Sequence, residues 1–202
     1  VYNGIDTEAF CPHPEIQRVP KRIIATASAD MPLKGLDYLL SAVGQLRKRH
    51  DDLELMVVGT PKPGGHTEKM IEGLGLRSTV SFVNNLTTQQ LAGLYAQATL
   101  AVVPSLYEGF GLPAGEAMSC GIPVISSDGG ALPEIVGDAG VIVPAGNAQA
   151  LEKAIGELLQ NPEKREEIGK RGRQRILERF SWDVAAQEMT QYYRDVLADA
   201  HS

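Results

Sequence analysis

Residues 105–121 read Ser-Leu-Tyr-Glu-Gly-Phe-Gly-Leu-Pro-Ala-Gly-Glu-Ala-Met-Ser-Cys-Gly, which predicts a glycine-rich bend that opens a helix. The apolar run at 100–103, just before it, has the length and composition of a buried strand. Pro113 suits the first helical position because its missing N–H would have no partner there, and Gly121 suits the C-terminal stop. The sequence therefore predicts a strand, a glycine loop and a helix from Pro113 to about Cys120.

This glycine loop has the features of an anion site. Gly109 and Gly111 permit a tight turn and let backbone N–H groups approach a ligand, and the N-terminus of a helix favours phosphate. Glu108 and Glu116 are separated by seven residues, and their carboxylates can accept hydrogen bonds from sugar hydroxyls. The same pattern also fits an ordinary strand-loop-helix unit in which Glu116 only complements the helix dipole.

Apolar runs of strand length alternate with helical periodicity along the chain, which is typical of βα units around a parallel sheet. We expect strands at 22–27, 53–59, 80–83, 100–103, 123–126 and 141–143. The chain then becomes helical, with Asn147, Asn161 and Ser181 as expected N-caps. The predicted fold class is α/β: a Rossmann-like, doubly wound parallel sheet of about six strands, with helices on both faces and extra C-terminal helices.

Composition disfavours several classes of function for this chain of 202 residues. A net charge of −6 and a pI of about 5.3 argue against a nucleic-acid partner. No stretch approaches the roughly 20 apolar residues of a membrane span. Cys11 and Cys120 lie far apart without a C-x-x-C motif, so we expect reduced thiols and a cytoplasmic location. The sequence has no D-x-D pair to hold a divalent ion, and we expect no metal.

Several short motifs occur in order along nearly the whole chain. They are Asn-Gly-Ile-Asp at 3–6 with Phe10, Leu-Lys-Gly at 33–35, Glu-Gly-Phe-Gly-Leu-Pro at 108–113, Gly-Glu-Ala-Met-Ser-Cys-Gly-Ile-Pro-Val-Ile at 115–125, Gly-Gly-Ala-Leu-Pro-Glu at 129–134 and Glu-Arg-Phe-Ser-Trp at 178–182. Together they resemble the signature of the retaining glycosyltransferases of family four, also called group 1, which have the two-domain GT-B fold. In that family two glutamates are likewise separated by seven residues.

The resemblance implies that the chain is the C-terminal half of a GT-B fold. Residues 1–20 would then be the interdomain crossover, 21–180 the donor-binding Rossmann-like domain, and 181–202 a helix that crosses back to an N-terminal domain. The implied activity is transfer of a hexosyl group, with retention, from a nucleoside-diphosphate sugar, without a further cofactor. The acceptor, a glycan, lipid or small molecule, would lie mainly against the N-terminal domain, which could also dock on a membrane. We therefore expect this chain alone to bind nucleotide without transferring sugar.

The resemblance also implies roles for individual residues. Lys34 and Glu108 would be catalytic, with Lys34 on the diphosphate and Glu108 on the transferred sugar, while Glu116 would bind the ribose hydroxyls. The remaining expected nucleotide-sugar contacts are Gly109, Phe110, Gly111 and Leu112, through their backbone N–H groups, and Val83 and Asn84 beside the base. One departure stands out, because Ala29 occupies the position where the family usually carries an arginine.

Alternatives stay open at the level of sequence. One is a non-catalytic nucleotide-binding or interaction module of the same fold, and another is a nucleotide-sugar epimerase or phosphorylase, because fold alone does not determine the reaction. Lys62 lies in a loop that either covers the donor or is simply surface. Gly129 and Gly130 either line the crevice or serve packing. The apolar stripe of the last helix either packs on this domain or stays exposed.

Overall fold

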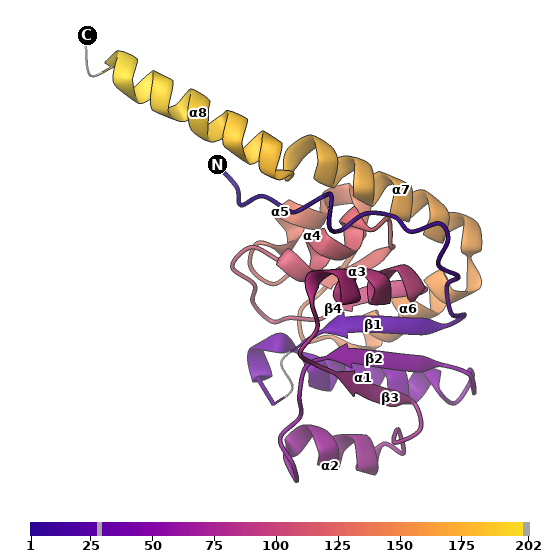
Figure 1. Ribbon diagram of the computed structural model, residues 1–202. Coiled ribbons are helices and arrows are strands. Elements are labelled where there is room, and N and C mark those ends of the chain that lie inside the picture. Colours follow the sequence, from indigo (N-terminus) through magenta and orange to yellow (C-terminus); the bar gives the residue numbers. More distant parts are fainter. Residues whose placement is uncertain (28–29, 200–202) are drawn as a thin grey trace.

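The structure is a computed structural model that describes residues 1–27 and 30–199 (Figure 1). Its strands are β1 Arg22–Thr26, β2 Glu54–Val58, β3 Val80–Val83, β4 Leu100–Val103, β5 Val124–Ser127 and β6 Val141–Val143. Its α-helices are α1 Leu36–Leu46, α2 His66–Gly73, α3 Thr88–Gln97, α4 Leu112–Ser119, α5 Leu132–Val136, α6 Ala148–Gln160, α7 Pro162–Arg179 and α8 Trp182–Asp199. Two short 3-10 helices are η1 Pro32–Lys34 and η2 Gly137–Ala139.

The six strands form one sheet in the order β3-β2-β1-β4-β5-β6, with every neighbouring pair parallel. This confirms the predicted doubly wound sheet and its six strands. The bounds of β3, β4 and β6 agree with the sequence prediction, and β5 begins at Val124, one residue later than expected. Helix α4 begins at Leu112, so Pro113 occupies the second helical position rather than the first.

Two apolar cores lie on the two faces of the sheet because successive strand residues point to opposite sides. Ile23 and Ile24 of β1 show this alternation: the first belongs to the core beneath α1, α2 and α6, and the second to the core beneath α3, α4 and α5. Both side chains are fully buried. Each face of the sheet is therefore covered by helices, as predicted.

The helix starts follow the capping residues in the sequence. Thr87 and Gln90 form a reciprocal capping box at α3. Asn147 accepts from the N–H of Ala150 at 2.9 Å to cap α6, and Asn161 caps α7 in the same way. At α8 the Ser181 hydroxyl accepts from the N–H of Val184 at 3.3 Å, which confirms the last expected cap.

The N-terminal segment packs across the domain, toward α7 and the start of α8. The N–H of Ile5 donates to the carbonyl of Phe180 at 2.6 Å, and Ile5 also bridges Ser181. Phe10 is buried against the ring of Tyr95, with ring centroids 6.2 Å apart. The segment is thus part of the folded body.

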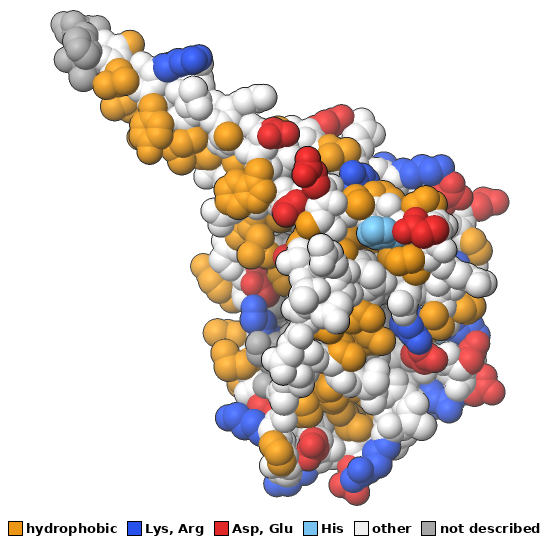
Figure 2. Space-filling view, in the orientation of Figure 1, with side chains coloured by type: hydrophobic (Ala, Val, Ile, Leu, Met, Phe, Trp, Pro, Cys, Tyr) orange, Lys and Arg blue, Asp and Glu red, His pale blue; other side chains and the backbone are white. Residues whose placement is uncertain are grey.

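Helix α8 projects away from the body of the molecule (Figure 1). Its apolar side chains gather along one side of the projecting helix, as the orange atoms in Figure 2 show. Trp182 is 59 % exposed and Tyr193 is 60 % exposed, whereas Ala185 is buried. Of the two alternatives for this stripe, exposure is therefore the correct one. None of the helices in the described residues has the length and apolar character needed to cross a membrane.

Candidate functional site

The centre of the sheet contains the point where the strand order reverses. From β1 the chain proceeds outward through β2 and β3, and from β4 it proceeds the other way through β5 and β6. The loops that leave the carboxyl ends of β1 and β4 therefore diverge, and the crevice between them is the usual ligand site of such sheets. The β1 loop leads into η1, which ends at Lys34, and the β4 loop leads into α4.

Lys34 and Glu108 form an ion pair across this crevice. The Lys34 Nζ donates to Glu108 Oε1 at 2.7 Å, and the buried Ser105 hydroxyl donates to the same oxygen at 2.8 Å. The Glu108 side chain is 10 % exposed and the Lys34 side chain 30 %. The other carboxylate oxygen, Oε2, accepts from none of the residues that the structure describes. The structure thus brings together two residues that lie 74 positions apart.

Close backbone packing holds the two loops together. The N–H of Leu106 donates to the carbonyl of Leu33 at 2.8 Å. Gly35 has φ +64°, and a Cβ at that position would lie 2.0 Å from the carbonyl oxygen of Pro104. Glycine is required here on both counts. Lys34 therefore ends η1, and Gly35 separates it from the start of α1.

The glycine loop presents backbone N–H groups at the start of α4. Gly111 has φ +99° and occupies the N-cap. The N–H groups of residues 109–112 donate to none of the residues in the described part of the chain. A Cβ on Gly109 would meet no atom within 4 Å. The expected tight turn thus rests on Gly111, while Gly109 has no left-handed φ and instead leaves open space beside the free N–H groups.

Glu116 lies in the fifth position of α4, beyond its first turn, and contacts a different partner. Its Oε2 lies 3.5 Å from the hydroxyl of Tyr95, which is 1 % exposed. Burial raises the pKa of Glu116 to about 7, and the hydrogen bond from Tyr95 acts in the opposite direction. The interpretation in which Glu116 only complements the helix dipole is wrong, because no acidic residue lies in the first turn.

Gly129 and Gly130 support the Glu108 loop from the β5 side. A Cβ on Gly130, where φ is +65°, would lie 2.2 Å from the carbonyl oxygen of Glu108. A Cβ on Gly129 would lie 2.6 Å from the carbonyl oxygens of Ser105 and Leu106. The N–H of Ala131 donates to the Glu108 carbonyl at 2.9 Å. Packing therefore accounts for both glycines, and that packing positions Glu108.

Sequence reasoning missed three residues that shape the site: Ser105, Tyr95 and Asp30. Asp30 has φ +60°, and its carboxylate accepts from the N–H of Lys62 at 2.7 Å and of Thr67 at 3.0 Å. It thereby ties the loop after β2 to the loop after β1. Hydrogen bonds between residues so far apart cannot be predicted from a local sequence pattern.

Ala29, at the position where the resembled family usually carries an arginine, lies outside the described residues.

The two residues expected beside the base lie at the carboxyl end of β3. Val83 accepts a hydrogen bond from the N–H of Gly59 at 2.8 Å through its carbonyl. Asn84 is exposed, and its Nδ2 donates to the Thr60 hydroxyl at 2.9 Å. They lie at the same edge of the sheet as the crevice but, by strand order, two strands away from β1. Within the described residues no cluster of three His, Cys, Asp or Glu side chains is suited to a metal ion.

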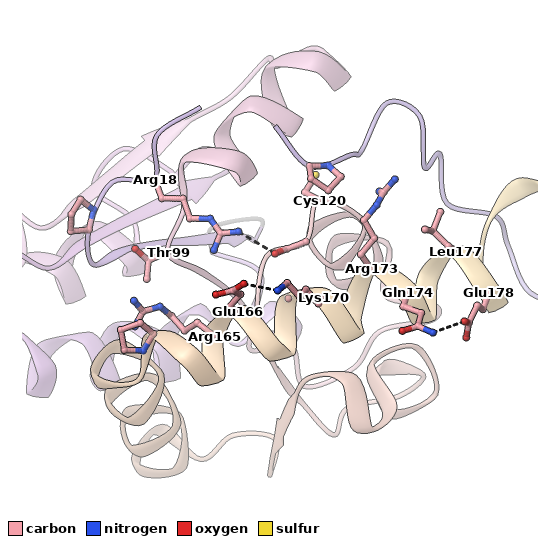
Figure 3. A pocket seen from close by; sticks show the side chains of 15 residues that line it. Arg18, Thr99, Cys120, Arg165, Glu166, Lys170, Arg173, Gln174, Leu177 and Glu178 are labelled. Atoms are coloured by element: carbon pink, nitrogen blue, oxygen red, sulfur yellow. Dashed lines mark hydrogen bonds and ion pairs between the residues drawn. The ribbon is translucent and has the colours of Figure 1, made fainter. Parts of the chain in front are cut away.

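A groove of about 910 Å³ lies elsewhere, between α7 and residues 12–20 (Figure 3). It is lined by Pro20 and Thr99, which precede strands β1 and β4, so it lies at the amino edge of the sheet. Its cations already have partners: Arg18 donates to the carbonyl of Gly121 at 3.2 Å, and Lys170 pairs with Glu166. Strand direction therefore places this groove opposite the Lys34–Glu108 crevice.

Comparison with known proteins identifies the family of this chain. The family model described as glycosyl transferases group 1 matches residues 13–175. The chain is 44 % identical over 199 residues to the MMP alpha-(1->4)-mannosyltransferase of Mycolicibacterium hassiacum, covering 96 % of the chain and 47 % of that protein. It is 30 % identical over 196 residues to the GDP-mannose-dependent alpha-(1-6)-phosphatidylinositol monomannoside mannosyltransferase of Mycolicibacterium smegmatis, with 89 % and 51 % covered.

Solved structures of glycosyltransferases share the fold of this chain. Sucrose-phosphate synthase from Thermosynechococcus elongatus superposes with a TM-score of 0.85 at 32 % identity, over 98 % of this chain and 52 % of that one. The chain thus spans about half the length of the relatives it matches. Its six-stranded parallel sheet with surrounding helices is that of a GT-B C-terminal domain. The chain belongs to the group 1 glycosyl transferases.

Proposed function

We propose that this chain is the donor-binding domain of a retaining hexosyltransferase that uses a nucleoside-diphosphate sugar. The observation that carries the proposal is the Lys34–Glu108 pair at the strand-order reversal, beside backbone N–H groups that donate to none of the described residues. A cation and free N–H groups suit a diphosphate, and carboxylate oxygens suit sugar hydroxyls. Two of the similar proteins are named as mannosyltransferases, which supports the transfer of a hexose.

In this proposal the diphosphate binds between Lys34 and the N–H groups of Gly109, Phe110, Gly111 and Leu112. An ammonium has three N–H donors, of which Glu108 uses one, so Lys34 retains donors for phosphate oxygens. These positive groups stabilise charge on the departing diphosphate. We propose in addition that the reaction needs no metal ion.

The two glutamates take different parts of the donor. Glu108 presents its Oε2 to hydroxyls of the transferred sugar, while Lys34 and Ser105 hold Oε1. Glu116 accepts from the ribose hydroxyls, and the base lies near Val83 and Asn84. We count Glu108 and Lys34 as the catalytic residues because both contact the reacting end of the donor.

The acceptor, in this proposal, contacts mainly an N-terminal domain. Residues 1–20 form the crossover, 21–180 the donor domain, and 181–202 the segment that returns to the other domain. The exposed aromatic side of α8 supports this arrangement, since Trp182 and Tyr193 offer a large apolar surface (Figure 2). The two free cysteines, Cys11 and Cys120, fit a cytoplasmic location.

Isothermal titration calorimetry of this chain with UDP, GDP and ADP tests the donor site. We expect one nucleotide to bind, Lys34→Ala and Glu116→Ala to weaken that binding strongly, and no sugar transfer without the N-terminal domain. Silence with all three nucleotides would instead indicate an interaction module. Identification of the products that the complete enzyme forms tests the reaction. A product in which the transferred sugar keeps the anomeric configuration of the donor supports the proposal. An epimerised nucleotide sugar or a free sugar phosphate contradicts it.

A further inference from the structure

The hydroxyl of Tyr95 is a buried polar group where three elements meet. Tyr95 belongs to α3, and its hydroxyl lies 3.0 Å from the Thr26 Oγ1 at the end of β1. It lies 3.4 Å from the carbonyl oxygen of Pro113 and 3.5 Å from Glu116 Oε2, both on α4. A buried hydroxyl is costly unless it is hydrogen-bonded, and these three oxygen atoms are the partners available to it.

The possible proton arrangements around this hydroxyl are few. A tyrosine hydroxyl has one proton to donate, and a carbonyl or an ionised carboxylate can only accept. The Tyr95 proton therefore goes to Pro113 or to Glu116, and Thr26, whose hydroxyl can act either way, donates to the Tyr95 oxygen. When Glu116 is ionised, its charge makes it the stronger acceptor. Thr26, Tyr95 and Glu116 then form a directed chain of hydrogen bonds.

We propose that Tyr95 is a positioning residue for the nucleotide site: its hydroxyl, backed by Thr26, occupies Glu116 Oε2 and so directs Glu116 Oε1 toward the ribose hydroxyls. The inference rests on the proposed function, because it assumes that Glu116 binds the ribose. Tyr95 itself does not contact the nucleotide, since its side chain is 1 % exposed.

The arrangement can be measured through the pKa of Glu116. Burial raises the pKa of Glu116 to about 7, while the hydrogen bond from Tyr95 lowers it. Burial also raises the pKa of Tyr95, which stays neutral and remains a donor at all working pH values. Cys120, at the C-cap of the same helix, is a further titratable group that interacts with Glu116, and burial raises the pKa of its thiol to about 12. Removing the Tyr95 hydroxyl should therefore raise the pKa of Glu116.

The test is nucleotide affinity of Tyr95→Phe as a function of pH, measured by calorimetry on this chain. Affinity of the unmodified chain should rise with pH through about 7, as Glu116 ionises. We expect Tyr95→Phe to bind about fivefold more weakly at pH 7 and to shift the midpoint upward by about half a pH unit or more, the effect of one hydrogen bond. Thr26→Val should also weaken nucleotide binding and raise the pH midpoint, but by a smaller amount. This variant provides the test if Tyr95→Phe folds poorly.

A matched control separates positioning from general loss of a buried hydroxyl. The Thr99 hydroxyl donates to the Val19 carbonyl at 2.8 Å at the amino edge of the sheet. Thr99→Val should lower stability but leave affinity and midpoint unchanged. An unchanged midpoint in both Tyr95→Phe and Thr26→Val would overturn the inference, even if affinity fell uniformly. Failure of the unmodified chain to bind any nucleotide would instead refute the proposed function.

Discussion

Glu108 and Glu116 flank the same glycine loop, yet the protein holds their carboxylates in different ways. Glu108 is compensated by the Lys34 ammonium and the Ser105 hydroxyl, both on one oxygen. Glu116 has a neutral hydroxyl at 3.5 Å and a raised pKa. The first carboxylate is thus paired with a cation, whereas the second forms no ion pair with any residue that the structure describes. The comparison teaches that two carboxylates on one loop can be held differently, the first by an ion pair and the second by burial beside a neutral hydroxyl.

The largest expected effect comes from breaking the support of the Glu108 loop. Gly130→Ala would place a Cβ 2.2 Å from the Glu108 carbonyl oxygen at φ +65°. We expect a loss of about 3 kcal/mol or more in unfolding free energy, measured by urea denaturation. Gly109→Ala is the matched control, since its Cβ meets nothing within 4 Å. Equal stability of the two variants would contradict this account of the loop.

Removing the charge partner of Glu108 should have the next largest effect. Lys34→Ala leaves a carboxylate that is 10 % exposed without its cation. We expect a loss of about 2–3 kcal/mol in unfolding free energy and at least a tenfold loss of nucleotide affinity. Lys34→Ala combined with Glu108→Gln should recover part of the stability but none of the affinity. A double variant no more stable than Lys34→Ala would show that the pair does not act as described.

The environment of Glu116 is tested by measuring the unfolding free energy as a function of pH. Because the folded state raises the pKa of Glu116 from 4.5 to about 7, folding favours the protonated acid. Its contribution to stability is therefore present below pH 4.5 and is lost as pH rises to about 7. Glu116→Gln should match the unmodified chain at pH 4 and exceed its unfolding free energy by about 3 kcal/mol at pH 8. Parallel stability curves for the two proteins would argue against a desolvated carboxyl.

The smallest effect is expected from the hydroxyl that assists Lys34. Ser105→Ala removes the donor that lies 2.8 Å from Glu108 Oε1 and leaves the ion pair in place. We expect a loss of about 1 kcal/mol in unfolding free energy and a twofold to fivefold loss of nucleotide affinity. A loss as large as that of Lys34→Ala would mean that the ammonium contributes less than its position suggests.

Much of the site could be predicted from sequence because its parts are local. The Gly111 turn, the start of α4 and the position of Glu108 follow from residues within one short segment, where glycine and proline have definite backbone preferences. The tight turn was expected at both Gly109 and Gly111, whereas of these two only Gly111 has a left-handed φ. Ser105 and Tyr95 were missed because a serine before a loop and a tyrosine on an amphipathic helix are common in any α/β domain.

The sequence alone determined the six strands, the helix caps and the family, because periodicity, capping side chains and motif order are properties of the linear chain. Only the tertiary structure decided that Lys34 pairs with Glu108, that Tyr95 meets Glu116 and that Gly130 packs on the loop. These contacts join segments far apart in sequence, and the parallel strand order that places β1 beside β4 is what brings them together. Contacts between side chains on different strands and loops of such a sheet cannot be predicted from the periodicity of the sequence.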